Sequence, residues 1–186
     1  SSIYLSFDRT GFRRHKDDFD VFLPGQKEGK VAIVTGGSSG IGLNVVNFLS
    51  GLKVDTYSLS RSGDQIENDI HKFFLSLDVS NFKDILNYCH EAPERIDYLV
   101  LNAGGMPQEK VLNDQGVESQ FASQVIGHYL MMRHLFELKK LHEETKVVWT
   151  TSGGMYLCKY DESFATGKMK GYDKVKVYAN AKRAQV

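Results

Sequence analysis

The stretch Lys30–Leu49, KVAIVTGGSSGIGLNVVNFL, decides which fold the sequence predicts. Lys30–Thr35 is a short apolar run rich in β-branched residues, which is typical of a strand buried on both faces. The glycine-rich turn TGGSSGIG (35–42) follows, and a helical pattern begins inside it. That pattern places four apolar residues on one side of the helix: Ile41, Val45, Phe48 and Leu49.

Strand, glycine-rich turn and helix together have the layout of a dinucleotide site. The glycines let the chain turn sharply, and free N–H groups at the helix N-terminus then bind the pyrophosphate. The glycine spacing is GxxxGxG, and an ordinary tight loop is the alternative interpretation. The flanking strand and helix favour the nucleotide site.

Composition narrows the class of protein. The 186 residues suffice for one domain of ordinary size. The 23 basic and 23 acidic residues balance, so nothing indicates a nucleic-acid or anionic-membrane partner. The two cysteines form neither a metal motif nor a disulfide framework, and no apolar run reaches the length of a membrane span. The first residues also lack a signal-peptide core. We therefore expect a cytoplasmic protein with no transmembrane segment and no metal.

We divide the chain into an N-terminal arm, residues 1–29, and a nucleotide-binding domain, residues 30–186. We expect the scattered aromatic residues of the arm to pack on the domain: Tyr4, Phe7, Phe12, Phe19 and Phe22. Four further strands are predicted at 54–59, 72–77, 98–101 and 146–150.

Helices are predicted between these strands, at 81–90 with Ser80 as its cap and at 118–140, and a last helix begins near Val177. The apolar stripe of the long helix contains Phe121, Val125, Ile126, Tyr129, Leu130 and Phe136. We expect a polar surface loop at 155–175. The alternation predicts an α/β fold, a doubly wound Rossmann-type parallel sheet with strand order 3-2-1-4-5. Its ligand crevice lies at the carboxyl ends of the first and fourth strands.

Two features at that edge carry chemistry. Where the second strand ends, an acidic residue would bind the ribose of NAD, but the sequence reads Ser60-Arg61-Ser62. Arg61 can pair with a 2′-phosphate, which favours NADP(H) and leaves NAD(H) as the alternative. Tyr178 and Lys182 are four residues apart on one helix face, so the ammonium group can favour the phenolate. Such a tyrosine can give a proton to a carbonyl or take one from an alcohol, and Ser152 can donate a hydrogen bond to the developing alkoxide.

Five motifs in this order resemble the short-chain dehydrogenase/reductase family: TGGSSGIG, Asp78-Val79, LNAGG, TSGG (151–154) and YANAK (178–182). The arm before Gly29 and the segments SGGM and VYAxxKRxQ are similar to the subgroup of dehydrogenase/reductase SDR family member twelve. The resemblance implies a Rossmann fold and NADP-dependent carbonyl reduction or alcohol oxidation. It also implies a small carbonyl or alcohol substrate of apolar character, and it leaves homo-oligomerisation open.

The resemblance also implies roles for particular residues. Tyr178 would be the acid/base, Ser152 would orient the carbonyl, and Lys182 would stabilise the phenolate and bind the nicotinamide ribose. Asp78 and Val79 would hold the adenine. The full set implied for the cofactor is Gly36, Ser38, Ser39, Gly40, Ile41, Gly42, Arg61, Asp78, Val79, Asn102, Ala103, Gly104, Tyr178 and Lys182.

The sequence departs from the family pattern in two places. The pattern FxxNxxGH reads FASQVIGH here, so Gln124 replaces the asparagine that supports a proton-relay water. The chain also stops four residues after Lys182, and the C-terminal strands of the family are absent from it.

Three functions follow from these observations. The leading hypothesis is an NADP-dependent short-chain oxidoreductase with a Ser/Tyr/Lys site. The alternative is a non-catalytic protein of the same fold that binds NADP(H), for which Gln124 is the indication. A third hypothesis, an interaction protein with a decayed site, predicts no cofactor affinity.

Overall fold

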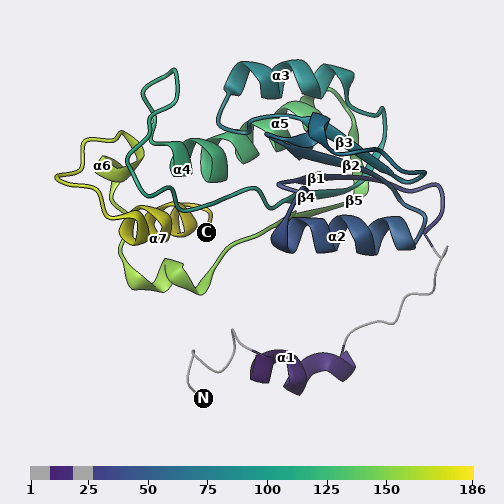
Figure 1. Cartoon of the computed structure of the whole chain (residues 1–186), viewed down its shortest axis with the longest axis horizontal. Helices are drawn as coiled ribbons and strands as arrows, with labels where there is room; N and C mark the ends of the chain where they lie inside the picture. Colours follow the sequence, from purple (N-terminus) through teal and green to yellow (C-terminus); the bar gives the residue numbers. More distant parts are fainter. Residues whose placement is uncertain (1–8, 19–26) are drawn as a thin grey trace.

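The computed structural model describes residues 9–18 and 27–186, which form helices around a parallel sheet (Figure 1). The strands are β1 Val31–Thr35, β2 Asp55–Ser60, β3 Lys72–Ser76, β4 Ile96–Leu101 and β5 Leu141–Trp149. The α-helices are α1 Arg9–His15, α2 Gly40–Gly51, α3 Phe82–Glu91, α4 Ser119–Phe121, α5 His128–Glu137, α6 Glu162–Ala165 and α7 Lys174–Ala184. A π-helix covers Ala122–Gly127, and 3₁₀ turns cover Lys16–Asp18, Gly63–Gln65 and Gly153–Leu157.

The sheet confirms the predicted fold. All neighbouring strands run parallel, in the order β3-β2-β1-β4-β5. The central strand β1 pairs on both sides, with Val34 opposite Ser58 in β2 and opposite Val100 in β4. Because parallel strands end at one edge, the turns after β1, β2, β4 and β5 meet there.

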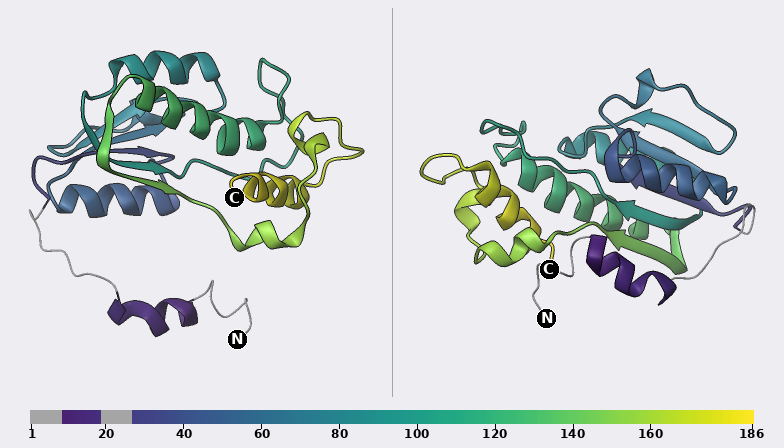
Figure 2. Two further views of the ribbon diagram at one scale, coloured as in Figure 1. Left: turned by 180° about the vertical axis from the view of Figure 1, so that it is seen from behind. Right: turned by 60° about the horizontal axis from the view of Figure 1, so that its bottom comes forward.

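Helices cover both faces of the sheet, as Figures 1 and 2 show. On one face, Ile33 and Leu99 form a core with Ile85 of α3 and Met131 of α5. On the other face, the neighbouring strand residues pack against α2. Since successive strand residues point to opposite faces, this explains why β1 is apolar from Val31 to Val34.

The predicted apolar side of α2 was wrong for Ile41 and Phe48, whereas Leu49 is buried as predicted and Val45 packs against the core. Ile41 is 69% exposed and Phe48 is 55% exposed, whereas Gly42, Val46 and Leu49 are buried. The helix is turned so that Gly42 faces the edge of the sheet. A glycine there lets the helix approach the sheet more closely than a larger side chain would permit. Ile41 consequently faces the cleft described below.

The long helix predicted at 118–140 is divided into α4, a π-helix and α5. Its predicted stripe was wrong for two of its six residues, while Leu130 packs against the core. Tyr129 and Phe136 are exposed. The buried positions of the π-helix and α5 are Ala122, Gln124, Gly127, His128, Met131 and Leu135. A π-turn contains more residues than an α-turn, so a face counted at the α-helical period shifts beyond it.

Smaller differences concern caps and the arm. Asn81, not Ser80, caps α3 by accepting hydrogen bonds from two backbone N–H groups. The Ser80 hydroxyl instead donates to Asp78. The last helix begins at Lys174, three residues before the predicted start, because Asp173 caps it.

The predicted loop at 155–175 contains the end of a 3₁₀ turn and the short helix α6. Of the aromatic residues in the arm, Phe12 is 60% exposed. Four others lie outside the described residues: Tyr4, Phe7, Phe19 and Phe22.

Candidate active site

A cleft of about 670 Å³ opens at the carboxyl edge of the sheet. The turns after β1, β2, β3 and β4 border it, as do two residues of α7. Every residue expected to bind the cofactor borders this cleft except Gly42, which lies behind the turn. The fold therefore gathers residues from positions 36 to 182 around one space.

The glycine-rich turn packs so tightly that side chains would not fit in it. A Cβ on Gly36 would lie 2.8 Å from the Cα of Ala103, and Gly36 has a φ of +70°. A Cβ on Gly42 would lie 2.2 Å from the carbonyl oxygen of Gly36. The side chain of Ser39, the N-cap of α2, makes no capping hydrogen bond. The first N–H groups of the helix therefore do not donate to this side chain. This geometry fits a pyrophosphate at the helix N-terminus.

A buried hydrogen-bond network joins this turn to β4 and α5. The Thr35 hydroxyl accepts bonds from the backbone N–H groups of Asn102 and Ala103, both at 2.9 Å. The Asn102 side-chain amide donates to the Thr35 carbonyl at 3.2 Å. His128 Nε2 lies 2.9 Å from the Thr35 hydroxyl. The network fixes the loop after β4 against the glycine-rich turn, so the two walls of the cleft are held together.

The neutral form of His128 fits this network. Its Nδ1 lies 3.2 Å from the Gln124 carbonyl, which can only accept, so we assign the proton to Nδ1. Nε2 then accepts from the Thr35 hydroxyl. Burial, with the positive charge of Lys182 as a smaller cause, lowers the pKa of His128 to about 3. The imidazole therefore stays uncharged at neutral pH and acts as a hydrogen-bond connector.

Two side chains of opposite charge, Asp78 and Arg61, lie at the end of the cleft that is next to β2 and β3. Asp78 accepts hydrogen bonds at one carboxylate oxygen from the Ser80 backbone and hydroxyl, which fixes its orientation. Arg61 is exposed at the cleft wall, and in the described ranges no carboxylate lies within 4.0 Å of its guanidinium. An unpaired arginine at this point can bind a phosphate.

Tyr178 and Lys182 lie on α7 and both border the cleft. The Lys182 Nζ lies 5.5 Å from the centre of the Tyr178 ring. It donates to the Thr150 carbonyl at 2.7 Å, which anchors the lysine to the end of β5. Burial lowers the pKa of Lys182 to about 8. The lysine thus supplies a partly desolvated positive charge close to the phenol.

Ser152 follows β5 and caps the 3₁₀ turn by accepting from the Gly154 N–H at 3.1 Å. It does not appear among the residues that border the cleft. A Cβ on Gly154 would meet both the Ser152 Oγ and the Tyr178 ring at 3.5 Å, so the serine and the tyrosine lie beside the same glycine. The hydroxyl proton of Ser152 remains available because its capping bond uses the oxygen as acceptor.

Gln124 is fully buried in the π-helix and does not border the cleft. Its side-chain amide donates to the Gly105 carbonyl at 3.1 Å, while its Oε1 has no partner among the described residues. Its backbone carbonyl accepts from Gln185 at 2.8 Å and from Trp149 at 3.3 Å. The longer side chain therefore holds the loop after β4 through Gly105.

The sequence analysis missed several residues of this region, among them Thr150, Gln120 and Ser123. The Thr150 carbonyl holds Lys182, and the Thr150 hydroxyl lies 3.4 Å from the Asn102 side-chain oxygen. Gln120 and Ser123 border the cleft from the start of the divided helix. The signal in the sequence that could have identified Gln120 and Ser123 was their spacing of three residues within an apolar pattern, which places them on one face of the helix.

The comparisons with known proteins agree with this geometry. A family model described as short chain dehydrogenase matches residues 30–160, which is more than half of the chain. The chain belongs to the short-chain dehydrogenase family. Relatives of this chain include Dehydrogenase/reductase SDR family member 12 from Bos taurus, 27% identical, and from Homo sapiens, 28% identical. Each match covers 91% of this chain and 56% of the relative, so the chain spans a little over half the length of these proteins.

Solved structures support the fold of this chain. An uncharacterized protein from Mycobacterium paratuberculosis superposes with a TM-score of 0.72 at 19% identity, over 86% of this chain and 59% of the other. A short chain dehydrogenase from Burkholderia cenocepacia in complex with NADP gives 0.64 at 19% identity, over 86% and 65%. Across residues 9–18 and 27–186, no helix is both long and apolar enough to cross a membrane.

Proposed function

We propose that the protein containing this chain is an NADP-dependent oxidoreductase that reduces a carbonyl or oxidises a secondary alcohol. The observation that carries the proposal is one cleft bordered by the glycine-rich turn, Arg61, Tyr178 and Lys182. Membership of the short-chain dehydrogenase family and the NADP bound by one structural neighbour support it. The test is NADPH oxidation by the complete natural protein over a panel of apolar carbonyl compounds, with alcohols and NADP⁺ as the reverse reaction.

The chain supplies distinct groups to this reaction. The N-terminus of α2 and its turn would hold the pyrophosphate, Arg61 the 2′-phosphate, and Asp78 with Val79 the adenine. NADPH, when bound, supplies the hydride. Tyr178 gives its hydroxyl proton to the carbonyl oxygen as the alcohol forms, and Lys182 stabilises the resulting phenolate. Ser152 donates a hydrogen bond to the same oxygen and orients it.

The cofactor preference can be tested at Arg61. Arg61→Asp is expected to weaken NADPH binding far more than NADH binding, because it removes a positive charge where the 2′-phosphate would lie. The loss of a charged hydrogen bond costs about 1.5–3 kcal/mol, which is roughly tenfold to 150-fold in affinity. Calorimetric titration with both nucleotides measures the difference. Equal weakening of both would show that Arg61 does not read the phosphate.

Variants of Gln124, which stands where the family pattern has asparagine, can distinguish an enzyme from the non-catalytic alternative. For an enzyme, Gln124→Ala is expected to slow turnover by well over tenfold, because it removes the amide that holds Gly105 at the cleft wall. A displacement of about 1 Å in a catalytic site can cost 10²-fold. Gln124→Asn is then expected to change the rate modestly, since it keeps the amide. A steady-state assay and NADPH titration on both variants distinguish rate from binding.

For a protein that only binds NADP(H), the expectation reverses. Gln124→Asn would restore turnover without altering NADPH affinity, and Gln124→Ala would have no catalytic effect. A Gln124→Asn protein that binds NADPH but stays inactive on the whole carbonyl panel would contradict the idea that this glutamine is what prevents catalysis.

A further inference from the structure

The segment that precedes α7 lies against the loop that follows β4. Figures 1 and 2 show the turn with α6 beside this loop. The Glu118 backbone N–H donates to the Ala165 carbonyl of α6 at 3.2 Å, and the Lys110 ammonium group donates to the Gly167 carbonyl. Because the loop after β4 borders the candidate active site, these contacts attach the segment to one wall of the cleft.

Tyr172 lies at the centre of this contact. Its hydroxyl donates to the Pro107 carbonyl at 2.9 Å and accepts from the Gln120 side-chain nitrogen at 3.1 Å. The same nitrogen lies 3.4 Å from the carbonyl of Lys174, the first residue of α7, so both of its N–H groups have an acceptor. Pro107 and Gln120 border the cleft, and Gln120 is buried. A chain of hydrogen bonds therefore joins the cleft wall to the start of α7.

The start of α7 determines where Tyr178 lies. Lys174 is one helical turn before Tyr178, and an α-helix pairs the carbonyl at i with the N–H at i+4. The carbonyl that Gln120 binds is therefore the one that holds the backbone of Tyr178. Lys182 has a different anchor, the Thr150 carbonyl at 2.7 Å. Loss of the first anchor is thus expected to displace Tyr178 more than Lys182.

We propose that Tyr172 and Gln120 are positioning residues for Tyr178. Their hydrogen bonds fix the first turn of α7 against the cleft wall, and so set the distance from the Tyr178 phenol to the carbonyl that it protonates. Neither residue takes part in the proton transfer, because both act through α7. This role rests on the proposed function, whereas the anchoring of α7 can be tested without a substrate.

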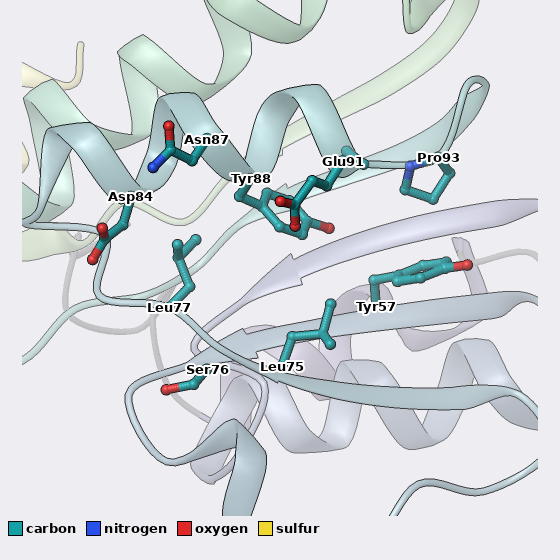
Figure 3. A pocket seen from close by; sticks show the side chains of 10 residues that line it. Tyr57, Leu75, Ser76, Leu77, Asp84, Asn87, Tyr88, Glu91 and Pro93 are labelled. Carbon is teal, nitrogen blue, oxygen red and sulfur yellow. The ribbon is translucent and has the colours of Figure 1, made fainter.

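The first measurement is amide hydrogen exchange in the complete natural protein and in its Tyr172→Phe variant. Exchange at residues 177–180 is expected to be faster by about fivefold in the variant, as for the loss of one hydrogen bond. Tyr57→Phe is the control, because Tyr57 lines a separate cleft of about 330 Å³ between α3 and the strands β2 and β3 (Figure 3). The control also loses one phenol hydroxyl and is expected to leave this exchange unchanged.

The second measurement is the steady-state reduction of 9,10-phenanthrenequinone, an apolar dicarbonyl compound, by NADPH. Tyr172→Phe and Gln120→Leu are each expected to lower kcat by about tenfold or more, since catalysis is sensitive to displacements of about 1 Å. The dissociation constant of NADPH is expected to stay unchanged in both variants. The double variant is expected to lose no more than either single variant, because both substitutions remove the same hydrogen bond.

The outcomes separate the positioning role from the proposed function. Unchanged exchange at residues 177–180 in Tyr172→Phe, or faster exchange with unchanged kcat, would overturn the positioning role alone. Losses that multiply in the double variant would also overturn it, because the two residues would then act separately. A natural protein that binds NADPH but reduces neither this quinone nor any compound of the carbonyl panel would overturn the proposed function and the positioning role together.

Discussion

Tyr178→Phe is expected to abolish most of the turnover while NADPH binding is retained. The substitution keeps the aromatic ring at the cleft wall and removes only the hydroxyl that would transfer the proton. General acid–base catalysis contributes roughly 10²–10⁴-fold, and we expect a loss of that size in kcat. The measurement is steady-state NADPH oxidation by the complete natural protein with any active carbonyl substrate, together with a calorimetric NADPH titration.

Tyr129→Phe provides the matched control for this prediction. Tyr129 is 46% exposed on α5 and does not border the candidate active site. The control loses the same hydroxyl group at a position where no proton transfer is expected, so its turnover should match that of the natural protein. Unchanged turnover in Tyr178→Phe would remove Tyr178 from the role of acid. Loss of NADPH binding in that variant would show that the hydroxyl serves the cofactor instead.

The second large effect is expected at Gly42. A methyl group there would lie 2.2 Å from the Gly36 carbonyl oxygen and 2.7 Å from the Asn102 side-chain nitrogen. Because one of these atoms belongs to the backbone of the turn, Gly42→Ala must push the turn away from α2. Overpacking of this kind costs about 1–3 kcal/mol of stability. We also expect NADPH affinity to fall by at least tenfold, since the turn would no longer present its N–H groups to the phosphates.

Gly51→Ala is the control for Gly42→Ala, because it lies at the other end of the same helix. A Cβ at Gly51 would meet no atom within 4 Å. Alanine favours helix over glycine by up to about 1 kcal/mol, so this variant should be as stable as the natural chain or slightly more stable. Denaturant unfolding and NADPH titration of both variants give the comparison. A Gly42→Ala protein of natural stability and affinity would contradict the packing argument.

The sequence by itself determined the sheet and the place of the cleft. The β-branched run at 30–35, the glycine-rich turn and the later apolar runs specified parallel strands, and their order was confirmed. Loops that follow parallel strands must meet at one edge of the sheet. For this reason Arg61, Asp78 and Asn102, which are far apart in the sequence, could be assigned to one cleft before any coordinates were considered.

Only the tertiary structure decided which helix faces are buried. Ile41 and Phe48 looked like core residues by period, but the close approach at Gly42 turns α2 so that they are exposed. The π-helix shifted the apolar face of the next segment and buried Gln124 and His128, because a local change in helical period cannot be read from an α-helical pattern.

The tertiary structure also decided how the polar groups are connected. Thr150 holds Lys182 through a backbone carbonyl, a group that every residue carries and that no motif can reveal. Sequence patterns specify which residues can be buried, while contacts between distant segments decide which of them are.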